Sequence, residues 1–214
     1  MGVKKNKENV HSVNSYQKDF SDFSNSSSVN NQNCKCLYTN ADQYLNKRNE
    51  MKALVEIHQP DIIGITEVKP KQARFDIQDS EIAIEGYELF HNLEEKGRGI
   101  ALLVKKELKP TPNATLKATF SENLFADCTQ LDGTSLVVGL IYRSPGSTLE
   151  NNAQLCELIR NTAEVKKENL LLVGDFNLPS IDWENEVCPI MKATLRHSFY
   201  KPTLKQIYSS TRRK

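Results

Sequence analysis

The chain of 214 residues is long enough for one α/β domain with a substantial core, or for one domain and a tail. Its 28 lysines and arginines almost balance its 27 aspartates and glutamates, so the net charge of +1 gives no argument for or against a polyanionic partner. No apolar run has the length of a membrane span, and no apolar segment follows the N-terminal lysines as in a secretory signal.

Residues 1–33 contain few apolar side chains and end in a run rich in serine and asparagine. A segment of this composition buries too little surface to offset the entropy lost on ordering. We therefore predict a disordered leader over residues 1–33 and a domain over residues 34–214.

The apolar pattern begins at Cys34. We expect a short strand over Cys34–Tyr38, then a helix that buries Met51 and Val55 and ends at Pro60. The apolar run within Asp61–Thr66 is typical of a buried strand.

Two hairpins are predicted in the middle of the chain. The first joins strands over Tyr87–Phe90 and Gly99–Val104 through a Gly-Arg-Gly sequence. The second joins Leu124–Leu131 to Ser135–Ile141 through an Asp-Gly pair, which is a strong turn signal.

The last third begins with a helical stripe that includes Leu155, Leu158 and Ile159, followed by a buried strand at Leu170–Val173. From Pro189 onward we expect one helix and then a polar end. Helices that alternate with strands, interrupted by hairpins, indicate an α/β domain with mixed sheets.

The five cysteines are an odd number without a C-x-x-C pair, and they lie in apolar stretches where a reduced cysteine is a small apolar side chain. This pattern favours a reducing compartment over a disulfide scaffold. We expect an intracellular protein, nuclear or cytoplasmic, that is not secreted.

Polar residues of a kind used in catalysis follow several of the predicted strands: Asn40, Glu67, Tyr142, Asp175 and Asn177. Loops at strand ends are where α/β folds usually build their sites. Carboxylate and amide oxygens suit a hard divalent cation. Taken singly, each residue also has an ordinary structural explanation, as a turn residue, a solvated carboxylate or a rim aromatic.

Five segments between about Cys34 and Trp183 then decide between these readings: YTNA at 38–41, PDIIGITE at 60–67, GRGIA at 97–101, IYRSP at 141–145 and GDFNLPSIDW at 174–183. Their ordered set resembles the endonuclease/exonuclease/phosphatase superfamily, and more narrowly the endonuclease domain of non-LTR retrotransposons of the jockey and chicken-repeat kind. The resemblance implies an α/β fold: a layered, deoxyribonuclease-like sandwich of two mixed β-sheets flanked by helices.

The resemblance also implies roles for the strand-end residues. Asn40 and Glu67 would belong to a site for Mg²⁺ or Mn²⁺, with Glu67 a direct ligand. Tyr142 would hydrogen-bond the scissile phosphate, Asp175 would act on the attacking water or the leaving group, and Asn177 would position the phosphate. Such an arrangement stabilises the charge that builds on the phosphate oxygens.

In the intact family the domain nicks one DNA strand, and the exposed 3′ end primes reverse transcription. DNA is therefore the expected partner, with no membrane involved, and the reverse transcriptase to which such domains are fused is absent from this sequence. Arg143 is a further candidate for contact with a substrate phosphate.

The sequence departs from the family in one respect. It contains no Ser-Asp-His triplet, and none of His11, His58, His91 and His197 has the expected setting. We therefore expect a domain that is incomplete at its C-terminus and does not nick DNA at a useful rate, since a missing general base costs about two to four orders of magnitude.

Other readings stay open. A phosphoinositide phosphatase or an apurinic endonuclease would keep the fold and change the substrate. A non-catalytic module that binds DNA or protein would keep the scaffold without the chemistry, and a decayed copy would have no cellular role.

Overall fold

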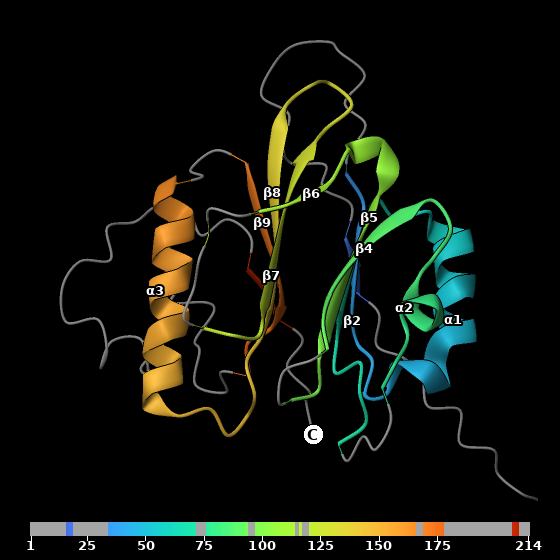
Figure 1. Ribbon diagram of the computed structural model, residues 1–214. Coiled ribbons are helices and arrows are strands. Elements are labelled where there is room, and N and C mark those ends of the chain that lie inside the picture. Colours follow the sequence, from blue (N-terminus) through green and yellow to red (C-terminus); the bar gives the residue numbers. More distant parts are fainter. Residues whose placement is uncertain are drawn as a thin grey trace, which may run out of the picture.

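Two β-sheets of five strands lie face to face, with helices on both outer faces (Figure 1). The computed structural model describes residues 16–18, 34–71, 76–93, 97–113, 116, 120–165, 169–177 and 207–209, with the backbone alone at 16–18, 163–165 and 207–209. The predicted fold class, a layered sandwich of two mixed sheets flanked by helices, is confirmed.

The first sheet has the strand order β1-β2-β3-β5-β4. Strands β2 and β3 are parallel, and every other neighbouring pair is antiparallel. The strands are β1 (Tyr16–Lys18), β2 (Cys36–Asn40), β3 (Ile62–Thr66), β4 (Tyr87–Asn92) and β5 (Ile100–Lys105).

The second sheet has the order β10-β9-β8-β7-β6. Strands β8, β9 and β10 run parallel, whereas β6, β7 and β8 are antiparallel neighbours. The strands are β6 (Thr111–Pro112), β7 (Asn123–Thr129), β8 (Ser135–Tyr142), β9 (Leu170–Asp175) and β10 (Ile207–Ser209).

Helices α1 (Tyr44–His58) and α2 (Asp79–Ile82) cover the outer face of the first sheet, and α3 (Leu149–Val165) covers that of the second (Figure 1). A single turn of 3₁₀ helix, η2 (Lys106–Leu108), follows β5. Helix α1 ends just before Pro60, as predicted, and Gln59 adopts a left-handed backbone at its C-terminus. No helix in the described part of the chain combines the length and apolarity needed to cross a membrane.

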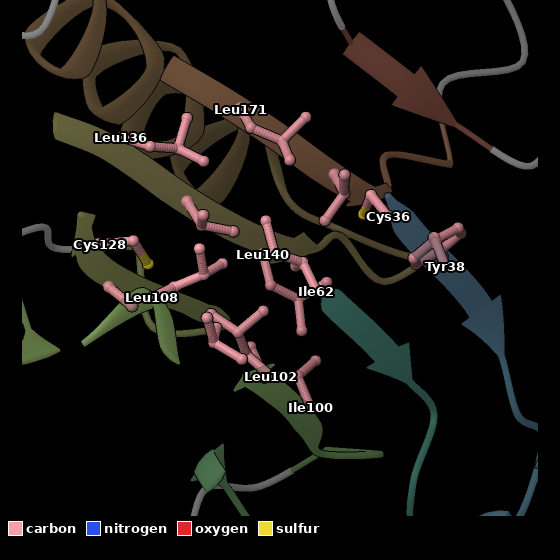
Figure 2. Packing of buried hydrophobic residues seen from close by; sticks show 14 of the residues in the cluster. Cys36, Tyr38, Ile62, Ile100, Leu102, Leu108, Cys128, Leu136, Leu140 and Leu171 are labelled. Atoms are coloured by element: carbon pink, nitrogen blue, oxygen red, sulfur yellow. The ribbon is translucent and has the colours of Figure 1, made fainter. Parts of the chain in front are cut away.

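The period-2 alternation of the strands divides the core into three layers. In β5, Ile100, Leu102 and Val104 face the other sheet, while Ala101 and Leu103 face α1 and α2. Figure 2 shows the layer between the sheets, where Leu102 of one sheet and Leu140 of the other belong to one buried cluster. Because both faces of the central strands are buried, their side chains are apolar almost without interruption.

The observed strands differ from the predicted ones mainly at their ends. The first runs over Cys36–Asn40 instead of Cys34–Tyr38, because Lys35 precedes the pairing with β3 and Asn40 still takes part in it. Within the predicted leader, Tyr16–Lys18 form β1; the rest of residues 1–33 lies outside the described residues. Most of the chain after Asn177 does too, including the helix predicted from Pro189, but Ile207–Ser209 form a strand where a polar end was predicted.

Candidate active site

Three of the polar residues at the strand ends, Asn40, Tyr142 and Asp175, continue the inward-facing rows of the two sheets. Cys36 and Tyr38 of β2 lie in the layer between the sheets, and Asn40 is next in that row. On the same grounds Asp175 follows Leu171 and Val173 in β9. Because β2 is parallel to β3 and β8 is parallel to β9, their carboxyl ends lie at the same edge of each sheet.

Two hydrogen bonds join the sheets at this edge. Asn40 Nδ2 donates to Asp175 Oδ2 at 3.0 Å, and Tyr142 Oη donates to Glu67 Oε1 at 3.1 Å. Each bond links a residue of the first sheet to one of the second. Residues separated by 135 and 75 positions in the sequence are thereby brought into one cluster.

Left-handed backbone at two residues directs side chains into this cluster. Thr66 faces inward and hydrogen-bonds Tyr38, so a regular strand would send Glu67 to the opposite face. Instead Glu67 has φ of 55° and its carboxylate contacts Tyr142. Asn177 has φ of 43°, which asparagine tolerates, and its backbone N–H donates to Asp175 Oδ1 at 3.1 Å. Such conformations concentrate at functional sites.

Glu67, Tyr142 and Asp175 are buried, and burial shifts the pKa values of Tyr142 and Asp175. Burial raises the pKa of Asp175 above its ordinary value; hydrogen bonds from Asn40 and Asn177 oppose the shift, and the charge of Glu67 adds to it. Burial and the neighbouring Glu67 carboxylate raise the pKa of Tyr142 as well. The phenol of Tyr142 is therefore a proton donor at neutral pH.

The sequence reasoning missed Arg98 and Asp42. Arg98 Nη1 contacts Glu67 Oε2 at 2.6 Å and its Nη2 contacts Asp42 Oδ1 at 2.7 Å. The available signal was the Gly-Arg-Gly sequence: both flanking glycines, Gly97 and Gly99, have positive φ, so this connection has a special conformation. The sequence alone does not predict the contact between Arg98 and Glu67, because that contact depends on which strands pair.

Arg143, predicted to contact a substrate phosphate, is only 4% exposed and directed at the protein itself. Its Nε donates to Asn152 Oδ1 on α3 at 2.7 Å, and its Nη1 donates to the carbonyl of Asn177 at 2.6 Å. In return, Asn177 Nδ2 donates to the carbonyl of Arg143 at 2.8 Å. This placement ties the loop of Asp175 and Asn177 to helix α3.

Replacing Asn152 with alanine should therefore lower the free energy of unfolding by about 1–3 kcal/mol, because the buried guanidinium loses its acceptor. Asn161→Ala, at an exposed position of the same helix, is the matched control and should change it by less than about 0.5 kcal/mol. Urea denaturation of both variants checks this. Equal stability of the two would show that the contact with Arg143 has no structural weight.

The histidines of the described part lie elsewhere. His58 ends α1, and His91 of β4 pairs through Nε2 with Asp79 Oδ1 of α2 at 3.0 Å. His11 and His197 fall outside the described residues.

The carboxylate and amide oxygens of the cluster are the type of ligand that a hard divalent cation prefers. Within the described residues, no group of three or more His, Cys, Asp or Glu side chains is arranged to hold a metal ion. However, the carboxylates of Glu67 and Asp42 already converge on one cationic group, the guanidinium of Arg98. The amide oxygen of Asn40, which accepts from the backbone N–H of Asp42 at 3.2 Å, lies beside them. An oxygen-only set of this type fits Mg²⁺ or Mn²⁺, which keep several waters.

Solved structures share this fold. The endonuclease domain of TRAS1, a telomere-specific non-LTR retrotransposon, superposes with a TM-score of 0.53 at 15% identity, covering 74% of this chain and 66% of that one. The AP endonuclease LMAP from Leishmania major gives 0.50 at 14% identity, covering 67% and 55%. The 3′ phosphatase NExo from Neisseria, bound to product DNA hairpin, gives 0.50 at 17% identity, covering 69% and 59%. The chain thus spans about two thirds or less of these structures.

Sequence comparison agrees. Exodeoxyribonuclease III of Haemophilus influenzae is 37% identical over 60 residues, which are 28% of this chain and 22% of that protein. The match therefore spans about a fifth of this curated relative. The sequence model of the Endonuclease/Exonuclease/phosphatase family matches residues 29–197, more than three quarters of the chain. This chain belongs to the endonuclease/exonuclease/phosphatase family.

Proposed function

We propose that the protein is a divalent-metal-dependent phosphodiesterase that cleaves DNA, an endonuclease of the kind found in non-LTR retrotransposons. The observation that carries the proposal is the convergence of Asn40, Glu67, Tyr142 and Asp175 at one edge of the two sheets. The ring of Tyr142 packs in the apolar core, but two carboxylates and an amide at the end of that core contribute little apolar packing. Their number and kind fit phosphodiester chemistry.

In this proposal Glu67 and Asn40 hold Mg²⁺ or Mn²⁺. When bound, the ion supplies positive charge to the phosphate oxygens. The Tyr142 phenol donates a hydrogen bond to a phosphate oxygen and so stabilises the charge that develops there. Asp175, held by Asn40 and Asn177, accepts or returns a proton at the attacking or leaving oxygen. Arg143 positions the loop of Asp175 and Asn177 from behind.

DNA is the substrate favoured over a phosphoinositide or an apurinic site, because the segments at 141–145 and 174–183 are those that resemble retrotransposon endonucleases. In the proposed role the enzyme nicks one strand of target DNA, and the 3′ end primes reverse transcription.

A substrate panel tests this choice. Protein in molar excess is incubated for hours with supercoiled plasmid, with a duplex that carries one abasic analogue, and with a soluble phosphoinositide headgroup, each with MgCl₂ and with EDTA. Excess protein is needed because neither described histidine lies in the site. We expect slow, MgCl₂-dependent nicking of the plasmid that weakens as salt rises. Cleavage confined to the abasic position, or release of phosphate from the headgroup, would contradict the choice of substrate.

The position of the histidines favours a second candidate, a DNA-binding module without catalysis. Its signature is DNA affinity that survives both Glu67→Ala and Asp175→Ala, measured by fluorescence anisotropy, together with no nicking by the wild type under any divalent ion.

A further inference from the structure

Arg98 is built into the site as a fixed positive charge. Its side chain and that of Glu67 are each only 12% exposed, so their ion pair at 2.6 Å is largely removed from water. A third donor, Nε, bonds the carbonyl of Lys69 at 2.9 Å. Together with the contact to Asp42, these bonds fix the guanidinium between two carboxylates.

The backbone around Arg98 is shaped for this placement. Gly97 and Gly99 have φ of 147° and 69°, and a Cβ atom on either would come within 2.7 Å of a neighbour, Glu122 Oε1 or Leu93 Cδ2. The same turn is fastened to the segment after Glu67, because the N–H of Lys69 donates to the carbonyl of Arg98 at 2.6 Å. The Gly-Arg-Gly sequence thus gives the backbone the conformation that places Arg98 beside Glu67.

Arg98 occupies an oxygen that a metal ion would need. Glu67 Oε1 accepts the hydrogen bond of Tyr142, and Oε2 accepts that of Arg98. A divalent cation that binds Glu67 must therefore either share a carboxylate oxygen with one of these donors or displace it. It must also approach a unit positive charge in a site that solvent screens poorly.

We propose that Arg98 is a resident counter-ion that competes with the divalent cation for Glu67 and so sets the metal affinity of the site. The inference rests on the proposed function, in which Glu67 is a metal ligand. In the metal-free protein the guanidinium neutralises Glu67 and Asp42. A bound cation would neutralise the same carboxylates in place of Arg98. The measured affinity for the cation is therefore lower than the affinity that the site would have without Arg98.

The test compares Mn²⁺ binding, by electron paramagnetic resonance of the free ion, in the wild type and in Arg98→Gln. Glutamine removes the charge but keeps an amide donor. We expect the Kd for Mn²⁺ to fall about tenfold or more in Arg98→Gln. Arg98→Lys, which keeps the charge, should stay near the wild-type value. Arg48→Gln is the matched control, because Arg48 donates to the carbonyl of Ser80 away from the site.

A thermal readout accompanies the binding data. Without divalent ions Arg98→Gln should melt below the wild type, since the carboxylates of Glu67 and Asp42 lose the positive charge between them. Added MgCl₂ should raise its midpoint by more than it raises that of the wild type. The double variant Glu67→Gln/Arg98→Gln should lose this gain. An Arg98→Gln protein that melts cooperatively but shows neither the tighter Kd nor the larger gain with MgCl₂ would overturn the inference.

The outcomes separate the inference from the proposed function. Equal or weaker Mn²⁺ binding in Arg98→Gln, with clear binding by the wild type, would overturn the competition and leave the metal-dependent enzyme standing. No Mn²⁺ binding by either protein at millimolar concentration would contradict the proposed function itself.

Discussion

Replacing Gly174 with alanine should prevent β9 from pairing normally with β8 and should destabilise the protein by about 4 kcal/mol or more. A Cβ at this position would lie 1.9 Å from the carbonyl oxygen of Ile141, and the residue has φ of 152°. Because the clash is with backbone, no change of side-chain rotamer relieves it. Asp175 follows directly, so the site should be lost with the strand pairing.

Gly86→Ala measures the cost of a positive φ without a steric clash. Gly86 has φ of 83°, but nothing lies within 4 Å of its Cβ position, so its replacement should cost only about 1 kcal/mol. Thermal and urea denaturation of both variants measure the difference. A Gly174→Ala protein as stable as Gly86→Ala would mean that the close approach of β8 and β9 at Gly174 is not as described.

Asp175→Asn should slow DNA nicking by about two to four orders of magnitude while leaving the melting temperature at pH 7 unchanged or higher. The expected effect on the melting temperature follows from the protonation of Asp175. The pKa of Asp175 is raised in the folded protein, so the native state binds a proton more readily than the unfolded chain does. The contribution of Asp175 to the free energy of unfolding therefore falls as the pH rises from 3.8, its ordinary pKa, through its raised pKa in the folded protein. Above the raised pKa the ionised carboxylate destabilises the fold by the full amount. Asparagine carries no charge and so removes this destabilisation. Nicking by the wild type should fall as the pH drops through the same range, because Asp175 becomes protonated.

Asp132→Asn is the matched control, because its stability effect has the opposite sign. Hydrogen bonds from Thr134 lower the pKa of Asp132 in the β7–β8 turn, so this carboxylate stabilises the fold above its ordinary pKa, and the contribution is lost as pH falls. Its replacement should lower the melting temperature slightly at pH 7 and leave nicking unchanged. An Asp175→Asn protein that melts lower and nicks normally would show a structural residue.

The sequence predicted the framework well, because the central strands are buried on both faces. Runs such as Ile62–Ile65 and Leu170–Val173 have few alternatives to a buried strand, and the turn at Asp132 and Gly133 was locally specified. The strand ends also marked Asn40, Glu67, Tyr142 and Asp175, since parallel strands deliver their carboxyl ends to one edge.

What the sequence did not reveal depends on long-range contacts. Arg98 meets Glu67 and Asp42 across 31 and 56 positions, and the pairing of β3 with both β5 and β2 brings the three residues together. Arg143 is buried with Asn152 of α3 as its hydrogen-bond acceptor. The motif at the end of β8 does not predict this contact with a helix.

Strand β1 was missed for a related reason: Tyr16–Lys18 are polar apart from the tyrosine, and their partner is the edge of β2, so no local pattern marks them. Composition alone indicated disorder there.

The most direct test of a metal-dependent site at the edge of the two sheets is the rate of plasmid nicking as a function of MgCl₂ concentration. It is measured under single-turnover conditions for the wild type and for Glu67→Gln. Glu50→Gln, at an exposed position of α1, serves as the control. We expect a saturable dependence on MgCl₂ for the wild type and the control, and for Glu67→Gln a rate at least tenfold lower at every concentration. Nicking that proceeds equally in EDTA, or that is unaffected by Glu67→Gln, would contradict a metal-dependent site at the edge of the two sheets.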